Sequence, residues 1–159
     1  MKIEKLDRIV MYVSDIDAAK EKFSKLLGIT FEEIPAEGVE PAILEPGPKA
    51  LELAQTQPPQ AQRERIRVAI SPSGLELMEG DISTMPGQSE GIRAFHFKVS
   101  DYEGAKKEME EKGIPLLTDI TLGLLREAIY HPDDLHGAMM GLVWYPTATP
   151  MEAIKTKGR

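Results

Sequence analysis

The sequence contains no cysteine in its 159 residues. That absence excludes disulfide bonds, thiolate nucleophiles and cysteine-based zinc sites. Basic residues are also scarce, since 19 Lys and Arg stand against 26 Asp and Glu, for a net charge of −7. Nucleic acids and anionic membranes attract proteins that present a basic face. We therefore expect neither nucleic acid nor a membrane among the partners of this chain.

Long hydrophobic runs are missing as well. The longest weakly polar run, from Gly137 to Tyr145, is far shorter than the ~18 residues of a membrane-spanning helix. The first apolar stretch, Ile9 to Val13, is too short for the core of a signal peptide. Hydrophobic residues make up 42% of the chain and charged residues 28%, which is typical of a globular domain. We expect a cytoplasmic location.

An internal repeat is the main feature that the sequence does contain. Segments 7–15 and 93–101 both have the pattern of a short strand that ends in Val-Ser-Asp. Each is followed by an amphipathic helix pattern, and a glycine, Gly28 or Gly113, ends that pattern. The Ser-Asp pair before each helix is placed to cap it. Two copies of one structural unit are therefore predicted.

Each copy continues with three predicted strands. They lie at 30–34, 66–70 and 75–78 in the first copy, and at 115–118, 126–130 and 138–144 in the second. Both copies thus have the order βαβββ, which predicts an α+β fold of two paired modules. We expect the modules at 1–81 and 91–146, a linker at 82–90 and a loose polar tail at 147–159. Residues 35–65 form an insertion with a short predicted helix at 49–55.

Three stretches resemble the vicinal oxygen chelate superfamily. They are LDRIVMYVSDIDAAKEKFSKLLGI, EGIRAFHFKVSDYEGAKKEMEEKGI and AIYHPDDLHGAMMGLVWY. That superfamily includes glyoxalase I, methylmalonyl-CoA epimerase, bleomycin-resistance proteins and extradiol dioxygenases, and the chain is most similar to the epimerase-like branch. The resemblance spans residues 5–145 apart from the insertion. It implies a glyoxalase-like curved sheet around a cleft, and a homodimer.

The resemblance also implies four metal ligands, in the order His or Gln, Glu, His, Glu. At the corresponding positions this sequence has Arg8, Glu76, Ala94 and Gly141. Only Glu76 is a ligand of the expected type. Ala94 and Gly141 offer no donor atom, and Arg8 places a fixed positive charge where the cation would bind. We therefore expect no metal and no other cofactor.

The candidate site residues are Arg8 and Glu76, at ligand positions that the resemblance implies, and neighbours that strand alternation puts on the same face. We predict His96 and Glu76 as catalytic residues, and Arg8, Tyr12 and Lys98 as substrate-binding residues. His96 is either a general acid/base or a structural histidine, and Glu76 is either a base or the remnant of a ligand set. Arg8 is predicted to contact Glu76, either as a structural ion pair or while also binding a substrate carboxylate.

Two functions fit these residues. The first is a metal-independent protein that binds a small, anionic organic molecule, in the manner of the antibiotic-sequestering members, with acid/base chemistry from His96 and Glu76 as an option. The second is a metal-dependent epimerase, lyase or dioxygenase with a rearranged site. The ligand positions favour the first function, and the sequence leaves open whether the protein is an enzyme.

Overall fold

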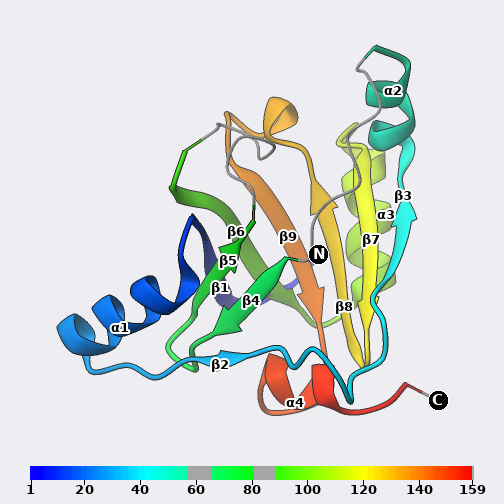
Figure 1. Ribbon diagram of the computed structural model, residues 1–159. Coiled ribbons are helices and arrows are strands. Elements are labelled where there is room, and N and C mark those ends of the chain that lie inside the picture. Colours follow the sequence, from blue (N-terminus) through cyan, green and yellow to red (C-terminus); the bar gives the residue numbers. More distant parts are fainter. Residues whose placement is uncertain (57–65, 81–88, 159) are drawn as a thin grey trace.

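The computed structural model describes residues 1–56, 66–80 and 89–158 (Figure 1). Within these ranges, nine strands form one sheet in the order β2-β4-β5-β1-β6-β9-β8-β7-β3. The strands are β1 (Ile3–Val13), β2 (Glu32–Glu33), β3 (Ile43–Pro46), β4 (Arg67–Ile70), β5 (Leu75–Glu79), β6 (Gly91–Val99), β7 (Leu116–Leu122), β8 (Leu125–Tyr130) and β9 (Met139–Trp144). The helices are α1 (Ile16–Leu27), α2 (Pro48–Thr56), α3 (Tyr102–Glu111), α4 (Pro150–Lys155) and the 3-10 helix η2 (Pro132–Asp134).

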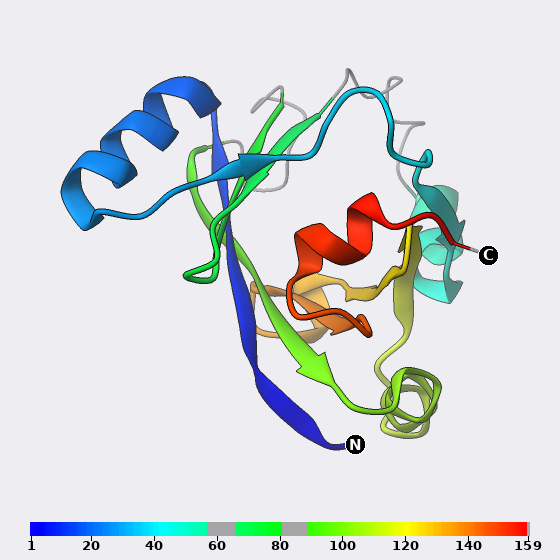
Figure 2. The ribbon, with the colours of Figure 1, turned by 90° about the horizontal axis from the view of Figure 1, so that it is seen from below.

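The two predicted modules meet at β1 and β6, which pair antiparallel so that Arg8 lies opposite His96 and Val10 opposite Ala94. Each of these strands also pairs in parallel with the last strand of its own module, β5 or β9. The sheet curls around a concave face (Figure 2). The predicted α+β fold of paired βαβββ modules is confirmed.

The helix ends follow the local sequence signals. The carboxylates of Asp15 and Asp101 accept hydrogen bonds from backbone N–H groups of the first turns of α1 and α3, at 2.9 and 3.0 Å. Gly28 ends α1 in the left-handed conformation, with φ at 66°. The predicted apolar face of α1 is only partly used, because α1 extends beyond the sheet (Figure 1) and leaves Leu26 and Leu27 exposed.

The insertion joins the two ends of the sheet. Residues 35–42 cross the open side of the sheet (Figure 2) and lead into β3, which pairs with β7 from Ile43 opposite Thr121 to Pro46 opposite Thr118. The predicted helix at 49–55 is confirmed by α2. The rest of the insertion, 57–65, and residues 82–88 of the predicted linker lie outside the described residues.

The prediction of a loose tail at 147–159 is wrong, because this segment contains α4. Thr149 and Glu152 form a capping box at its first turn. Met151, Ala153 and Ile154 are buried in one apolar cluster with residues of β4, β8 and β9. Val39, in the crossing segment 35–42, packs against the same cluster. The tail therefore fills one end of the concave face. Among the described helices, none is long and apolar enough to cross a membrane.

Candidate functional site

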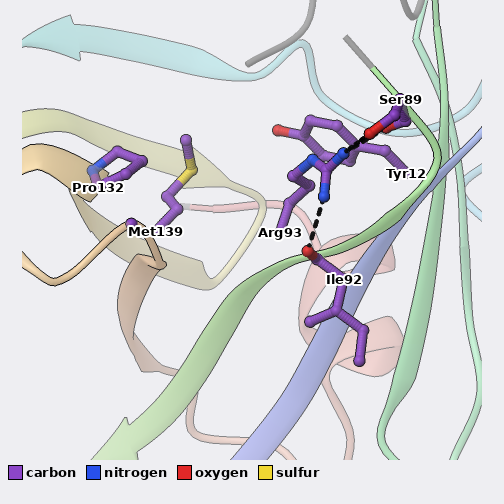
Figure 3. A pocket seen from close by; sticks show the side chains of 7 residues that line it. Tyr12, Ser89, Ile92, Arg93, Pro132 and Met139 are labelled. Atoms are coloured by element: carbon purple, nitrogen blue, oxygen red, sulfur yellow. Dashed lines mark hydrogen bonds between the residues drawn. The ribbon is translucent and has the colours of Figure 1, made fainter. Parts of the chain in front are cut away.

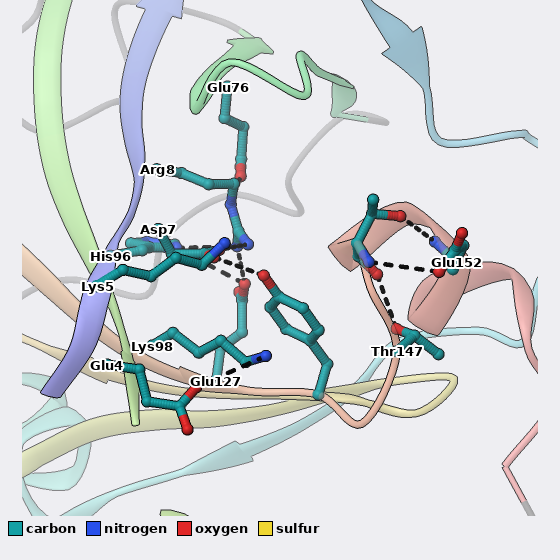
Figure 4. Close-up of polar contacts among 12 residues, drawn as sticks. Glu4, Lys5, Asp7, Arg8, Glu76, His96, Lys98, Glu127, Thr147 and Glu152 are labelled. Atoms are coloured by element: carbon teal, nitrogen blue, oxygen red, sulfur yellow. Dashed lines mark hydrogen bonds and ion pairs between the residues drawn. The ribbon is translucent and has the colours of Figure 1, made fainter. Parts of the chain in front are cut away.

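The concave face carries two features that bear on function. One is a cavity of about 330 Å³ beside Tyr12 (Figure 3). The other is a group of charged side chains around Arg8 (Figure 4). We call this group the Arg8 cluster, and it consists of Asp7, Arg8, Glu76, His96 and Glu127.

Arg8 lies at the centre of the cluster and uses all three of its nitrogen atoms. Its Nε donates to Glu76 at 2.6 Å, and Nη1 donates to Asp7 at 2.7 Å. Its Nη2 contacts Glu127 and the Nδ1 atom of His96, the latter at 3.0 Å. Only 2% of the Arg8 surface is exposed. The guanidinium is thus bonded to three carboxyl groups from three strands, away from solvent.

His96 contacts two members of the cluster through one ring nitrogen. Its Nδ1 atom lies 3.0 Å from Nη2 of Arg8 and 3.6 Å from Oε1 of Glu127. The other side of the imidazole ring lies against Gly141, where a Cβ atom would come within 2.6 Å of Cδ2. The glycine at the fourth expected ligand position therefore makes room for the ring of His96.

The charges of the cluster stabilise one another. Burial opposes the charge on Arg8, but Glu76, Glu127 and Asp7 raise its pKa above the usual range. Burial would raise the pKa of Glu127, but the charge of Arg8 and the hydrogen bond with His96 lower that pKa to about 2. Glu127 therefore stays ionised at neutral pH, as a counter-ion of Arg8.

Tyr145 and Lys5 extend the cluster through Asp7. The Tyr145 hydroxyl donates to Asp7 at 2.6 Å, and Nζ of Lys5 lies 3.1 Å from the same carboxylate oxygen. Burial and the bond to Asp7 raise the pKa of Tyr145 to about 12. Because Tyr145 also packs in the apolar cluster of α4, it links the C-terminal helix to the Arg8 cluster.

The residues present do not fit the four-ligand metal site that the resemblance implies. The first position is filled by the Arg8 side chain, Glu76 is bonded to it, and Ala94 and Gly141 have no donor atoms. Within the described ranges, no group of three or more His, Asp or Glu side chains is arranged to hold a metal ion.

The structure brings together three of the five predicted site residues. The predicted contact between Arg8 and Glu76 is confirmed, and His96 joins them. Lys98 lies elsewhere, with Nζ 4.0 Å from the centre of the Tyr145 ring and 3.8 Å from Glu4. Tyr12 lies at the opposite end of the concave face, where it lines the cavity.

Sequence reasoning missed Asp7 and Glu127. In a regular strand Asp7 and Arg8 would point to opposite faces, but the pairing of β1 with β6 shifts register between Leu6 and Arg8, and both side chains are buried. Glu127 lies on β8, which contributes no ligand position in the resemblance. The alternation of Leu125, Glu127 and Ile129 was the available signal, because it places a carboxylate on the apolar face of a predicted strand.

The cavity is separated from the Arg8 cluster by an apolar layer. It is lined by Tyr12, Ser89, Ile92, Arg93, Pro132, Gly137 and Met139. Val10 stands between Arg8 and Tyr12 on the same face of β1, and it packs with Ala94 and Met139. His96 and Glu76, which are 5% and 4% exposed, are therefore covered on the side that faces the cavity.

Comparisons with known proteins agree with this fold. The family described as Glyoxalase/Bleomycin resistance protein/Dioxygenase superfamily matches residues 5–140. Methylmalonyl-CoA epimerase from Mycobacterium tuberculosis is 20% identical, with a TM-score of 0.59 over 89% of this chain and 87% of that one. A variant of the Streptomyces coelicolor epimerase in complex with 2-nitronate-propionyl-CoA is also 20% identical, with a TM-score of 0.61 over 92% of this chain and 100% of that one.

A third solved structure is a methylmalonyl-CoA epimerase in complex with methylmalonyl-CoA and NH4+. It is 20% identical, with a TM-score of 0.62 over 94% of this chain and 100% of that one. Identities of this size show a shared fold and no more. No curated protein sequence matches the chain significantly.

Proposed function

The chain belongs to the Glyoxalase/Bleomycin resistance protein/Dioxygenase superfamily, and we propose that it binds a small organic anion without the help of a divalent metal. The observation that carries the proposal is the buried guanidinium of Arg8, bonded to Glu76, Asp7 and Glu127. It fills the position where the resemblance implies a metal ion and therefore supports the metal-independent part of the proposal. The anionic character of the ligand is carried over from the sequence prediction.

Physical chemistry argues against a metal at the same place. A divalent cation would meet the charge of Arg8 at contact distance in a region shielded from water, where repulsion between like charges is strong. Moving Arg8 away would leave a buried charge without its partners, which typically costs several kcal/mol. The carboxylate of Glu76, the one retained ligand, is already bonded to Arg8.

Binding is the part of the function that the geometry supports best. A cavity of about 330 Å³ with apolar walls and a few polar groups is a usual form of small-molecule site. A catalytic role for His96 and Glu76 stays a prediction, because both are buried and both hold Arg8. The predicted substrate contacts of Arg8 and Lys98 are not part of this proposal, because Arg8 is enclosed and Lys98 lies over the Tyr145 ring.

Thermal unfolding in the presence of candidate ligands tests the proposal. The panel contains organic acids, amides and amines of similar size, each measured with a chelator and again with added Mn²⁺ or Co²⁺. We expect organic acids to raise the melting temperature by mass action, and to do so equally in both conditions. Stabilisation that requires the added metal would contradict the proposal and support the metal-dependent alternative.

A further inference from the structure

We propose that Lys49, in helix α2 of the insertion, is a positioning residue for the cavity. Through its ion pair with Asp134 it holds in place the segment 131–137, which we call the 131–137 turn. Two residues of this turn, Pro132 and Gly137, line the cavity (Figure 3). The inference rests on the proposed function and deepens it, because it names a residue outside the cavity that affects how a ligand fits.

Gly47, the residue before α2, fixes the place where that helix begins. Its backbone N–H donates to the carbonyl of Leu117 on β7 at 2.9 Å. A Cβ atom at this position would lie 2.2 Å from the backbone oxygen of Leu116, so the close approach requires a residue without a side chain. The start of α2 is therefore attached directly to a strand of the sheet.

The side chain of Lys49 carries a charge that is largely withdrawn from water. Only 10% of this side chain is exposed, and its Nζ atom lies 3.3 Å from Oδ2 of Asp134. That oxygen is itself buried and accepts no hydrogen bond from the described residues, so the charge of Lys49 compensates it. Loss of the lysine charge would leave a buried carboxylate oxygen without a counter-ion, which destabilises the contact between α2 and the 131–137 turn.

Hydrogen bonds inside the 131–137 turn connect Asp134 to the cavity. The backbone N–H groups of Leu135 and Gly137 both donate to the carbonyl of Pro132, at 3.0 and 2.9 Å. Asp134 lies between these bonded residues, so a shift of its side chain toward or away from α2 moves the backbone that lines the cavity. The turn thus transmits the position of α2 to the cavity wall.

The backbone of the 131–137 turn also needs a restraint from outside. His136 has a φ angle of 56°, in the left-handed region that residues with a side chain rarely adopt, and Gly137 follows with a φ angle of 86°. A strained conformation persists where surrounding contacts hold it. One such contact is the packing of Leu135 against the apolar cluster beneath α3. The pair of Lys49 and Asp134 is the second, and it acts nearest the cavity.

Hydrogen exchange measured by NMR tests whether the ion pair holds the turn. Lys49→Met removes the charge and keeps the length of the side chain. We expect the amides of Leu135 and Gly137 to exchange about tenfold faster in this variant, while the amides of β6 keep their rates. Lys107→Met is the matched control, because Lys107 makes an exposed ion pair within α3, and it should change neither set of amides. Unchanged exchange in Lys49→Met would overturn the inference.

Titration with benzoate tests whether the turn matters for ligand binding. The cavity volume of about 330 Å³ lies near the lower end of the ~300–1,000 Å³ range of ligand pockets, which suits a compact acid. We expect Lys49→Met to weaken benzoate binding by about threefold or more, because a loosened wall must be ordered when the ligand binds. Lys49→Arg keeps the charge and should bind benzoate as the unchanged protein does. Faster exchange of the turn with unchanged benzoate affinity would overturn the positioning role, and so would absence of benzoate binding to the unchanged protein.

The partner residue provides a second variant. Asp134→Asn removes the other charge of the pair and should have the same effects on exchange and on benzoate affinity. If both residues act through one contact, the double variant with Lys49→Met should differ little from either single variant. Effects that add in full would overturn the inference. Asp134→Asn also keeps the inference testable if Lys49→Met does not fold.

The outcomes separate this inference from the proposed function. Equal benzoate binding by Lys49→Met, Asp134→Asn and the unchanged protein, all free of metal, would overturn the role of Lys49 and leave metal-independent binding intact. Binding that requires an added divalent metal would contradict the proposed function itself. The exchange measurement needs no ligand, so its result on the 131–137 turn does not depend on the proposed function.

Discussion

Arg8 combines a high desolvation cost with a full set of counter-ions. Taking a guanidinium out of water costs several kcal/mol, and close carboxylates offset that cost only when the geometry is good. Here bonds to Glu76 and Asp7 at 2.6 and 2.7 Å, together with the contact to Glu127, meet that condition. The partners come from β1, β5 and β8, so the cluster ties together both modules of the sheet.

Replacing Arg8 by alanine should therefore destabilise the fold strongly at neutral pH. Arg8→Ala leaves three buried carboxyl groups without their cation, and we expect a loss of about 3–5 kcal/mol in the free energy of unfolding. The loss should be smaller at about pH 4.5 than at pH 7, because buried carboxylates without a cation have raised pKa values and can take up protons. Urea unfolding of the variant and the unchanged protein at the two pH values measures this loss of stability.

The control for this prediction is Arg67→Ala. Arg67 makes partly exposed ion pairs with Asp17 and Glu33, and such pairs contribute little to stability because water screens them. If Arg8→Ala lowers the free energy of unfolding no more than Arg67→Ala does, the Arg8 cluster does not stabilise the contact between the two modules.

The lowered pKa of Glu127 predicts how the stability of the fold changes at low pH. Its pKa is lowered to about 2 in the folded protein, against an ordinary value of 4.5. A group with a lowered pKa adds stability above its unfolded pKa, and that stability is lost as the pH falls toward the folded pKa. Glu127→Gln should thus remove part of the decline in stability between about pH 4.5 and pH 2. If the free energy of unfolding falls equally with pH in Glu127→Gln and in the unchanged protein across this range, the assignment is wrong.

The sequence predicts part of this site. Matching positions to the superfamily placed Arg8 and Glu76 in contact, and strand parity put His96 on their face. Neither approach found Asp7, because its inward position depends on an irregular register between β1 and β6. Such a shift arises from tertiary pairing and leaves no mark on local alternation.

At the scale of elements, α4 is the largest difference from the sequence prediction. The polar composition of 147–159 suggested a tail, yet Thr149, Pro150 and Glu152 form a recognisable helix start. A six-residue helix is not stable alone. It persists because Met151, Ala153 and Ile154 are buried against residues of β4, β8 and β9, which only the folded chain brings together.

A pair of glycines tests the packing of α4. Gly28 and Gly123 both have positive φ angles, 66° and 59°. A Cβ at Gly28 would meet nothing within 4 Å, whereas a Cβ at Gly123 would lie 2.5 Å from the carbonyl oxygen of Ala153. Gly28→Ala should cost about 1–2 kcal/mol from backbone strain alone. Gly123→Ala should cost about 1–3 kcal/mol more, because α4 must move.

Equal melting temperatures for the two alanine variants would show that α4 is not packed over Gly123. The sequence prediction also missed the short length of β2 and the whole of β3. β2 has only two residues where five were expected at 30–34, and β3 pairs with β7 across about 75 residues of sequence. Pairings between distant segments are set by the fold and not by the strands' own residues.

At the scale of the whole molecule, the repeat predicted the two modules, and the resemblance predicted that they form a curved sheet. Two Val-Ser-Asp segments mark β1 and β6, and these are the strands at which the modules meet. The symmetry ends at the concave face, where Arg8 and Ala94 occupy matching positions with opposite chemistry. The face is thus divided into a cavity, the Arg8 cluster and the apolar packing of α4.

The resemblance further predicts a homodimer. Large apolar side chains exposed on α1 and β3, namely Leu26, Leu27, Ile43 and Leu44, are available for such contacts. Sedimentation at several concentrations should give the mass of two chains. A single-chain mass throughout would contradict this prediction and would leave the Arg8 cluster unaffected, since its residues lie within one chain.

The metal content of protein purified without a chelator tests the central claim most directly. If Arg8 is the cation of the site, elemental analysis should find Mn, Fe, Co, Ni and Zn far below one ion per chain. Incubation with these ions followed by gel filtration should leave that result unchanged, because the guanidinium and its carboxyl partners occupy the position. Near-stoichiometric retention of any one of these metals would contradict the account.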